Sequence, residues 1–271
     1  MARNRWREYR DRVALVTGAS SGIGAQLARD LAARGMRVAL VARRAERLDA
    51  LAETLGGGSR ALALPADVGE RAAAERAVGE AHQRFGRLDL VVNAAGVARH
   101  VLFKDHDVAD IERLVRTNLL GTIYVLKAAI PLLRATGGGA IVNVSSVAGK
   151  LGQPDEAVYA ATKFGVTGLS ESIAYELAPL GIHVLTVYPA LVRTEMFTPE
   201  ILARMPARAT RTFIETPEFS AAVLRALERG GFELTVPWYV GIAYALRTLV
   251  PALHRRIMRK LRLPVLPDLT R

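Results

Sequence analysis

The chain has 271 residues, 51% of them hydrophobic and 23% charged, which suits one soluble globular domain and is short for two. It has no cysteine, which excludes disulfides, thiolate metal sites and cysteine nucleophiles, and the sequence predicts no metal site. The formal net charge of +11 is concentrated at the ends, because residues 1–12 carry +3 and residues 241–271 carry +6.

Basic ends favour contact with an anionic surface such as a membrane or a nucleic acid, and solvated tails are an equal alternative. The segment Met1 to Arg12 has no apolar core behind it, so we do not expect a secretory signal. No stretch approaches the length of an uncharged transmembrane helix. The longest candidate, Val236 to Leu246, is interrupted by Arg247.

Strand-like and helix-like segments alternate along the chain. Short apolar runs predict strands at residues 12–17, 37–42, 60–64, 88–93, 139–145, 182–188 and 233–237. Helical spacing of apolar residues predicts helices at about 23–34, 48–55, 70–85, 107–135 and 156–179. Strands that are apolar on both faces and alternate with helices indicate a parallel sheet covered on both sides. We therefore predict a Rossmann-like, doubly wound α/β fold with three layers.

A glycine-rich turn, Thr17 to Gly24, links the first predicted strand to the first helix. Its glycines are spaced Gly-x-x-x-Gly-x-Gly, which is neither the G-x-G-x-x-G fingerprint nor a Walker loop. Glycines nevertheless let the backbone approach a pyrophosphate, and the N-terminus of the following helix favours negative charge. The position between strand and helix predicts a dinucleotide site, and a plain tight turn is the alternative.

The second predicted strand ends in Val41-Ala42-Arg43-Arg44, where the adenosine ribose of a dinucleotide is expected. A carboxylate there would favour NAD, but none is present, and a guanidinium suits a 2′-phosphate. Arg43, and with less weight Arg44, therefore predict NADP as the cofactor. The alternative is a solvated arginine at a helix start.

Tyr159 and Lys163 are four residues apart in a predicted helix and share one face. A phenol has a pKa near 10, and we expect the nearby ammonium to lower it, which would make Tyr159 a usable proton donor and acceptor. Ser145 and Ser146 end a predicted strand, at the sheet edge where ligands bind. The loop between Ser146 and Tyr159 is long enough for the two side chains to converge.

With these features the chain resembles the short-chain dehydrogenase/reductase family. The residues that carry the resemblance keep the family's order and spacing, and they are Thr17–Gly24, Asp67, Asn93–Gly96, Asn118, Ser146, Tyr159, Lys163 and Tyr188–Thr194. Two positions depart from the family pattern. The common Asn-Asn-Ala-Gly is Asn-Ala-Ala-Gly here, and the usual Pro-Gly is Pro189-Ala190, where alanine tolerates a positive φ poorly.

The resemblance implies a catalytic set of Asn118, Ser146, Tyr159 and Lys163. Tyr159 would protonate the substrate oxygen as hydride arrives from the nicotinamide, and Ser146 would orient that oxygen and stabilise its developing charge. Lys163 would lower the tyrosine pKa and hold the nicotinamide ribose. Asn118 would shape the site and anchor a water in the proton relay, and a hydrogen bond within its helix is the alternative.

The resemblance also implies the cofactor contacts. Asp67 would contact the adenine, residues 93–96 would pack near the adenosine, and Thr194 would hold the carboxamide. For Asp67, Asn93 and Thr194 a capping or turn role is the alternative. The residues expected to bind the cofactor are Gly18, Ser20, Ser21, Gly22, Ile23, Gly24, Arg43, Arg44, Asp67, Val68, Asn93, Ala94, Ala95, Gly96, Tyr159, Lys163, Pro189, Val192 and Thr194.

The segment from about residue 190 to residue 230 has no clear periodicity, which in a compact domain is typical of a lid or substrate loop. Its apolar side chains favour an apolar substrate, and ordinary packing is the alternative. They are Met196, Phe197, Ile201, Leu202, Met205 and Phe213. The nearby Arg193, Arg204 and Arg208 leave an acidic or CoA-linked substrate open.

Residues 238–271 are the least family-like part. Trp238, Tyr239 and Tyr244 lie in an apolar run, and leucine or isoleucine then recurs every four residues among cations, at Leu253, Ile257 and Leu261. This pattern is typical of a basic amphipathic helix on an anionic membrane surface. The alternative is a helix packed on the domain or on a partner subunit, and no nucleic acid is expected.

Together these observations predict a cytoplasmic NADP-binding catalytic domain over residues 1–237 and a basic extension over 238–271, for which peripheral membrane contact and packing on the domain or on a subunit both stay open. The predicted activity is NADP(H)-dependent interconversion of an apolar ketone or aldehyde and an alcohol, in a homodimer or homotetramer. One alternative is a catalytically silent NADP-binding regulator or scaffold, although such a protein needs no phenol–ammonium pair. Another is a peripheral membrane enzyme that acts on lipid.

Overall fold

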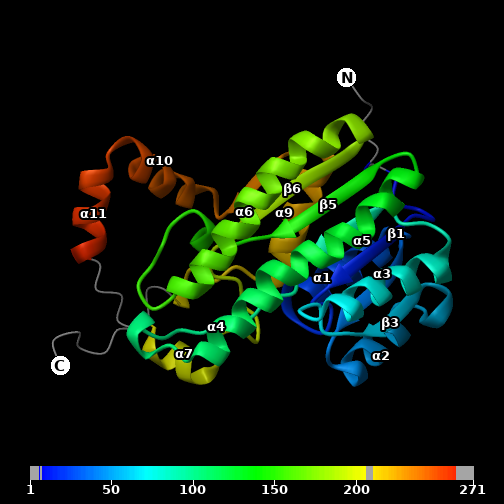
Figure 1. The fold of residues 1–271 in the computed structure, drawn as a ribbon, viewed down its shortest axis with the longest axis horizontal. Helices are drawn as coiled ribbons and strands as arrows, with labels where there is room; N and C mark the ends of the chain where they lie inside the picture. Colours follow the sequence, from blue (N-terminus) through cyan, green and yellow to red (C-terminus); the bar gives the residue numbers. More distant parts are fainter. Residues whose placement is uncertain (1–5, 7, 206–209, 261–271) are drawn as a thin grey trace.

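Seven parallel strands form the central sheet of the computed structural model, which describes residues 6, 8–205 and 210–260 (Figure 1). The strands are β1 (Val13–Thr17), β2 (Arg37–Ala42), β3 (Ala61–Pro65), β4 (Leu90–Asn93), β5 (Gly139–Val144), β6 (Ile182–Pro189) and β7 (Glu233–Val236). Their spatial order is β3-β2-β1-β4-β5-β6-β7, and every neighbouring pair is parallel. The strands lie close to the predicted apolar runs.

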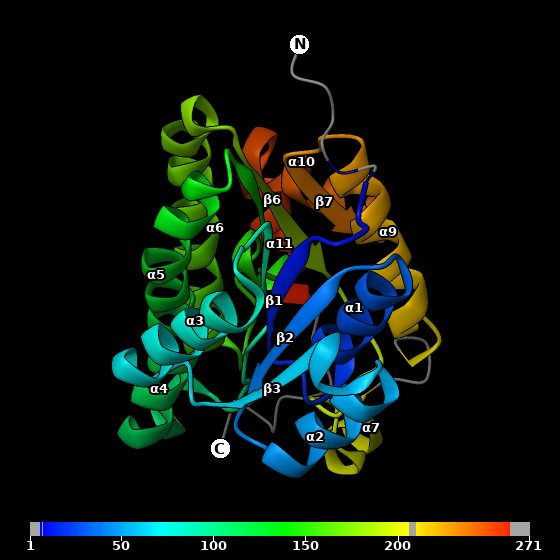
Figure 2. The ribbon, with the colours of Figure 1, turned by 90° about the vertical axis from the view of Figure 1, so that its right-hand side faces the viewer.

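Helices cover both faces of the sheet (Figure 2). One face carries α1 (Gly22–Ala33), α2 (Ala45–Thr54) and α9 (Thr216–Glu228). The other carries α3 (Arg71–Phe85), α5 (Gly121–Ala135) and α6 (Ala157–Leu177). This is the predicted doubly wound, three-layer fold, and every residue of β1, β4 and β5 is buried, as expected for strands covered on both faces.

Smaller elements join these layers. The remaining α-helices are α4 (Val108–Leu114), α7 (Pro199–Arg204), α10 (Gly241–Leu249) and α11 (Pro251–Lys260). Short 3₁₀ turns are η2 (Gly57–Ser59), η3 (Phe103–Asp105), η5 (Val147–Gly149), η6 (Ala178–Leu180) and η7 (Trp238–Val240). The helix α4 continues into α5 through a π-helical turn, η4 (Val115–Leu120), and π turns within helices are frequent at functional sites.

The continuous helix from Val108 to Ala135 is long and apolar enough to cross a membrane by length and composition alone. The sequence reading did not single it out. Its apolar residues Val125, Ala129 and Leu133 are buried with the sheet and α3. This packing gives the helix the role of a core helix in the described fold.

The predicted lid over residues 190–230 is too long at its C-terminal end. Residues 216–228 form α9, which packs on α1, with Phe219, Val223 and Leu227 completely buried. These apolar residues are spaced four apart, with Pro217 in the first turn, so the sequence did carry a helix signal. The part of the predicted lid that contains no helix packed on the sheet therefore ends near residue 215.

The site is positioned by the sheet topology. Strand order reverses between the neighbours β1 and β4, because β2 lies on one side of β1 and β5 lies beyond β4. The connections that follow β1 and β4 therefore leave toward opposite faces and open a crevice at the carboxyl edge of the sheet. The glycine-rich turn and the Asn93–Gly96 turn both lie at this edge.

Candidate active site

The glycine-rich turn depends on glycine at two positions. Gly18 has φ +68°, and a Cβ built there would lie 2.7 Å from the Ala94 carbonyl oxygen. A Cβ at Gly24 would lie 2.5 Å from the Gly18 carbonyl oxygen. Thr17 fixes the facing turn, because its hydroxyl oxygen accepts from the amides of Ala94 and Ala95, both at 3.1 Å. Glycine at these two positions therefore lets the turn pack closely against the Ala94 turn and against the start of α1, and this tight strand–turn–helix shape is the one expected at a pyrophosphate.

Arginine side chains border this turn. Arg44 donates to the Ser20 hydroxyl at 2.9 and 3.1 Å and to the Ser21 hydroxyl at 2.6 Å. Arg43 lies 3.8 Å from the Asp67 carboxylate and is more than half exposed. Arg43 was the stronger candidate in the sequence analysis, but it is Arg44 that contacts the glycine-rich turn. The residues that directly follow β2 are Arg43 and Arg44, so a 2′-phosphate would meet two cations there, each of them beside a carboxylate from another segment.

Glu195, which sequence reasoning missed, completes this group. Its carboxylate accepts from Arg44 at 2.8 Å and from Arg47 at 2.5 Å. The hydrogen bonds from these two arginines hold the pKa of Glu195 below its usual range. Its position directly after Thr194 was the available signal, but its arginine partners lie about 150 residues earlier in the chain and cannot be identified from spacing.

Asp67 and Val68 follow β3 at the same edge. The Asp67 carboxylate accepts from the Gly69 amide at 2.9 Å, which is the turn role named as the alternative, and it also faces Arg43. Val68 is buried and fixes the helix behind it, because a Cβ at Gly121 would lie 2.9 Å from a Val68 methyl group. Ile23 packs against the core at the start of α1.

The Asn93 side chain lies within the core. Its amide nitrogen donates to the Asn143 side chain at 2.9 Å, and Asn143 donates in turn to the Ser170 hydroxyl at 2.9 Å. This buried chain joins β4, β5 and α6. The Asn93 amide therefore holds the sheet to the helix that carries Tyr159, and Ala94, Ala95 and Gly96, which follow it, make up the rest of the predicted cofactor segment.

Asn118 lies in the π turn η4, and its side chain connects this turn to the loop after β4 and to α6. Its amide oxygen accepts from the Val97 amide at 2.8 Å, and its nitrogen donates to the Val97 carbonyl at 2.9 Å and to the Thr162 hydroxyl at 3.1 Å. A Cβ at Gly96 would lie 3.6 Å from Asn118 Oδ1 and 3.5 Å from Lys163 Nζ. Asn118 and Lys163 therefore both border Gly96, and the Asn118 side chain holds the loop after β4 to α6.

Ser146, Tyr159 and Lys163 come together as predicted. All three side chains are buried, and Lys163 Nζ lies 5.7 Å from the centre of the Tyr159 ring. The Lys163 ammonium donates to the Val144 carbonyl at 2.9 Å, and burial lowers its pKa to about 8. Ser146 accepts from the Ala148 amide at 3.1 Å, which places its hydroxyl at the end of β5.

The expected lowering of the Tyr159 pKa was wrong for this structure. Burial raises the pKa well above 10, the negative charge of Glu156 raises it further, and only the hydrogen bond with Ser146 lowers it. Tyr159 is thus held firmly in its protonated form, which suits a proton donor.

Glu156 and His100 form a pair beside Tyr159 that sequence reasoning missed. His100 Nδ1 lies 3.3 Å from the Glu156 carboxylate. Burial, together with the charge of Asp155, raises the pKa of Glu156 to about 7. Glu156 precedes Tyr159 by three positions at the start of α6, so helix geometry was the available signal. Its effect depends on burial, which the sequence does not give.

The residues after β6 lie against the glycine-rich turn. A Cβ at Gly22 would lie 3.0 Å from the Thr194 methyl group, and Val192 is buried. Pro189 ends β6, and the Ala190 amide donates to the Val236 carbonyl at 2.9 Å. Among described non-glycine residues only Asp11 and Asp155 have a positive φ, so alanine at 190 causes no backbone strain.

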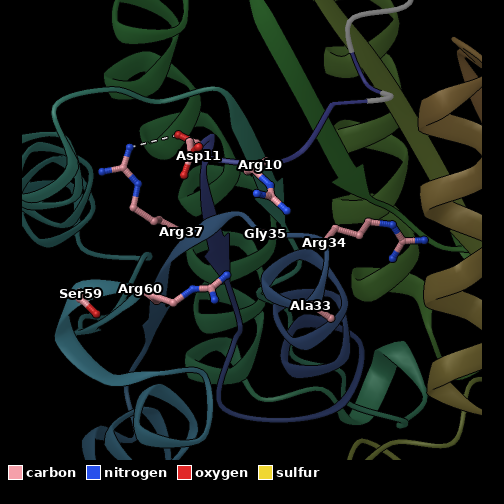
Figure 3. Close-up of a pocket in the computed structure, with 8 residues that line it drawn as sticks. All are labelled: Arg10, Asp11, Ala33, Arg34, Gly35, Arg37, Ser59 and Arg60. Carbon is pink, nitrogen blue, oxygen red and sulfur yellow. Dashed lines mark hydrogen bonds between the residues drawn. The ribbon is translucent and has the colours of Figure 1, made fainter.

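A separate hollow of about 610 Å³ lies at the opposite, amino edge of the sheet (Figure 3). Its lining includes Arg10, Arg34, Arg37 and Arg60. Arg37 donates to the main-chain carbonyls of Phe85 and Asp11. Arg60 donates to the carbonyl of Ala32, and Arg34 donates to the carbonyl of Asp30. These arginines stabilise carbonyls at helix ends and before β1, so the hollow is distinct from the predicted cofactor edge.

Comparison with known proteins agrees with this arrangement. Residues 12–203 match the short chain dehydrogenase family. The chain is 40% identical to D-threitol dehydrogenase of Mycolicibacterium smegmatis over 68% of this chain and 72% of the relative. It is 35% identical to 11-beta-hydroxysteroid dehydrogenase-like 4A of Arabidopsis thaliana, over 89% of this chain and 82% of the relative.

A solved structure shares the fold. It is a short chain dehydrogenase/reductase from Burkholderia phymatum in complex with NAD, with a TM-score of 0.80 and 24% identity, and the match covers 91% of this chain and 96% of that one. The fold, the family match over residues 12–203 and the relatives agree with the resemblance read from the sequence. The chain belongs to the short-chain dehydrogenase/reductase family of oxidoreductases.

Proposed function

We propose that the protein is an NADP(H)-dependent oxidoreductase that interconverts an apolar ketone or aldehyde and its alcohol. The observation that carries this proposal is the convergence of the buried Ser146, Tyr159 and Lys163 at the carboxyl edge, beside the glycine-rich turn. The family's relatives are named dehydrogenases and reductases, which supports the reaction class.

The proposed chemistry assigns one step to each side chain. When bound, the nicotinamide cofactor supplies or accepts the hydride. In the reductive direction the Tyr159 hydroxyl gives its proton to the substrate oxygen, so the phenolic O–H breaks and the alcohol O–H forms. The Ser146 hydroxyl donates a hydrogen bond to the same oxygen and stabilises its developing charge. Lys163 would hold the nicotinamide ribose, with its ammonium 5.7 Å from the centre of the Tyr159 ring, where a phenolate remains until a proton returns.

The preference for NADP rests on the charges around the turn. Arg44 contacts Ser20 and Ser21, and Arg43 precedes it, so the residues that follow β2 are both cations, where an NAD enzyme is expected to carry an acidic residue for the ribose. The Burkholderia phymatum protein contains NAD, but its 24% identity carries only the fold to this chain. Gly18, Gly22 and Gly24 would hold the pyrophosphate, and Thr194 would hold the carboxamide.

An apolar substrate is supported by the residues around the segment after β6. Phe197 and Phe213 form an edge-to-face pair with ring centres 4.9 Å apart. Arg193, one of the cations that left an acidic substrate open, is paired with Glu215 at 2.7 Å. Arg208 and the Arg204 side chain lie outside the described residues. The relatives named for hydroxysteroids match this chain over 89% of its length.

The test separates the enzyme from a silent NADP-binding scaffold. Purified protein is titrated with NADPH and NADH by fluorescence and is then assayed with a panel of apolar ketones. Tyr159→Phe should keep cofactor binding and the unfolding midpoint but lose turnover by at least about a hundredfold. Turnover within a few-fold of wild type would remove Tyr159 as the proton donor. Cofactor binding with no turnover on any carbonyl would favour the scaffold.

Assembly and location are part of the same proposal. We propose a homodimer or homotetramer, which light scattering on the purified chain measures directly. The cytoplasmic location expected from the cysteine-free sequence stays a prediction, and fractionation of the native cells tests it.

A further inference from the structure

The C-terminal arm, which we define as residues 238–260, lies outside the three layers of the fold, beyond α6 (Figure 1). No residue of η7 or α10 is buried. The arm is attached through one face of α10. There Lys150 Nζ lies 5.3 Å from the Tyr244 ring centre, the Arg247 guanidinium lies 5.2 Å from that of Phe164, and Arg247 donates to the Lys150 carbonyl.

The rest of the arm presents large apolar side chains to solvent. Thirteen large hydrophobic residues are exposed in the described chain, and seven of them lie on this arm of 23 residues. They are Trp238, Tyr239, Ile242, Leu249, Val250, Leu253 and Ile257. Trp238 and Leu249 are each 77% exposed. On an ordinary protein surface, exposed hydrophobic residues are scattered singly. Seven of them gathered on one short arm indicate that the arm contacts a membrane or another molecule.

The charge on the arm indicates which kind of partner it binds. Residues 238–260 contain Arg247, Arg255, Arg256, Arg259 and Lys260 but no aspartate or glutamate. Arg255 and Arg256 are exposed on α11, which also carries Leu253 and Ile257 one turn apart. In a two-fold contact between copies, the same patch would meet itself and bring arginines together without carboxylates. An anionic lipid surface accepts both the cations and the apolar side chains.

We propose that the C-terminal arm binds the surface of an anionic lipid bilayer. Trp238, Ile242 and Leu249 enter the interface between headgroups and acyl chains, where tryptophan is favoured, and Arg255 and Arg256 contact the headgroup phosphates. Leu261, the last position of the predicted apolar repeat, lies outside the described residues.

The attachment of the arm places the bilayer beside the active site. Lys150 lies in the loop that follows Ser146, and Phe164 follows Lys163 on α6. A bilayer bound to α10 would therefore lie next to the wall of the substrate site, where an apolar carbonyl or alcohol dissolved in lipid would be concentrated. This last step rests on the proposed function, whereas membrane binding itself does not.

The two tryptophans make the binding measurable in the intact chain. Trp6 is 4% exposed and Trp238 is 77% exposed. A change in tryptophan fluorescence emission on vesicle binding therefore reports mainly on the arm. The full chain is mixed with phosphatidylcholine vesicles with or without phosphatidylglycerol, and sedimentation and emission spectra are recorded. We expect co-sedimentation and a blue shift with the anionic vesicles, and the shift should be absent in Trp238→Phe. No co-sedimentation with anionic vesicles would overturn the proposal.

Two double variants separate the apolar and charged contributions. Ile242→Ser with Leu249→Ser should abolish co-sedimentation, and Arg255→Gln with Arg256→Gln should weaken it by about fivefold per arginine. Tyr175→Ser removes an aromatic side chain of similar exposure from α6 and should change nothing. Cofactor binding should be equal in all variants, so a failed enzyme assay and a failed membrane assay remain distinguishable.

Two results would contradict the assignment of the arm. Equal vesicle binding by wild type and the Ile242→Ser, Leu249→Ser variant would place the contact elsewhere. Loss of an oligomer in that variant by light scattering, with no vesicle binding by wild type, would make the arm a subunit contact instead.

Discussion

Arg44, at the start of the connection from β2 to α2, pairs with Glu195 after β6, and the Nη1–Oε2 distance is 2.8 Å. The same guanidinium donates to Ser20 and Ser21 of the glycine-rich turn. One side chain thus joins the turn, the end of the second strand and the segment before α7. It ties the proposed ribose pocket to the proposed lid.

We expect Arg44→Ala to weaken NADPH binding by about tenfold or more and to change NADH binding little, because a charged hydrogen bond to the 2′-phosphate is lost only with NADPH. Fluorescence titration of both cofactors measures this. Arg47→Ala is the matched control, since Arg47 contacts Glu195 but not the turn serines. An equal loss for both cofactors would assign Arg44 to the structure of the turn.

Glu195→Gln should have the opposite effect. The carboxylate competes with a phosphate for Arg44, and its removal leaves that guanidinium more available. We expect NADPH to bind a few-fold more tightly and NADH to be unaffected. Weaker NADPH binding in this variant would mean that Glu195 is needed to hold Arg44 in place.

Gly18→Ala should destabilise the protein and impair cofactor binding. Its Cβ would lie 2.7 Å from a main-chain oxygen at φ +68°, so we expect a loss of about 2–4 kcal/mol in the free energy of unfolding. Gly57→Ala is the control, because Gly57 has φ +65° but no atom within 4 Å of a built Cβ. That variant should lose only about 1 kcal/mol. Urea denaturation compares the two, and equal losses would show that contact with the Ala94 turn costs nothing.

Glu156 should make stability depend on pH. Its pKa is raised from 4.5 to about 7 in the folded state, so the folded protein binds the proton more tightly than the unfolded chain. The associated stability is complete below about pH 4.5 and is lost as the pH rises through about 7, on the order of 3 kcal/mol in total. Denaturation series in urea from pH 4.5 to 8 measure this slope.

Glu156→Gln should flatten that part of the profile, because glutamine resembles the protonated carboxyl group. Glu171→Gln, an exposed position on the same helix, should leave the slope as it is in wild type. Lys163 has the opposite dependence. Because its pKa is lowered from 10.5 to about 8, stability should rise as the pH increases from about 8 to 10.5. A profile unchanged by Glu156→Gln would exclude this carboxyl group as the source.

Two phenylalanines distinguish core from lid within residues 190–230. Phe219 on α9 is completely buried, so Phe219→Ala should lower the free energy of unfolding by about 3–5 kcal/mol. Phe197, paired with Phe213, is only partly buried, and Phe197→Ala should change KM for an apolar substrate with little loss of stability. A large stability loss at Phe197 would place that segment in the core as well.

The sequence by itself determined the strands, most of the helices and the position of the glycine-rich turn. These features follow from local patterns: apolar runs for buried strands, helical spacing for the helices, and glycines that sterics require, such as Gly18. It also determined that Ser146, Tyr159 and Lys163 converge, because parallel strands end at one edge and positions four apart share a helix face.

Only the tertiary structure decided how these groups are charged and paired. Arg44 contacts Glu195, 151 positions away, and Asn93 bonds across the sheet to Asn143 instead of facing the cofactor edge. The pKa of Tyr159 is raised, not lowered, because burial and the charge of Glu156 outweigh the hydrogen bond with Ser146. Burial and long-range pairing depend on which segments the fold brings together, and no local pattern contains that information.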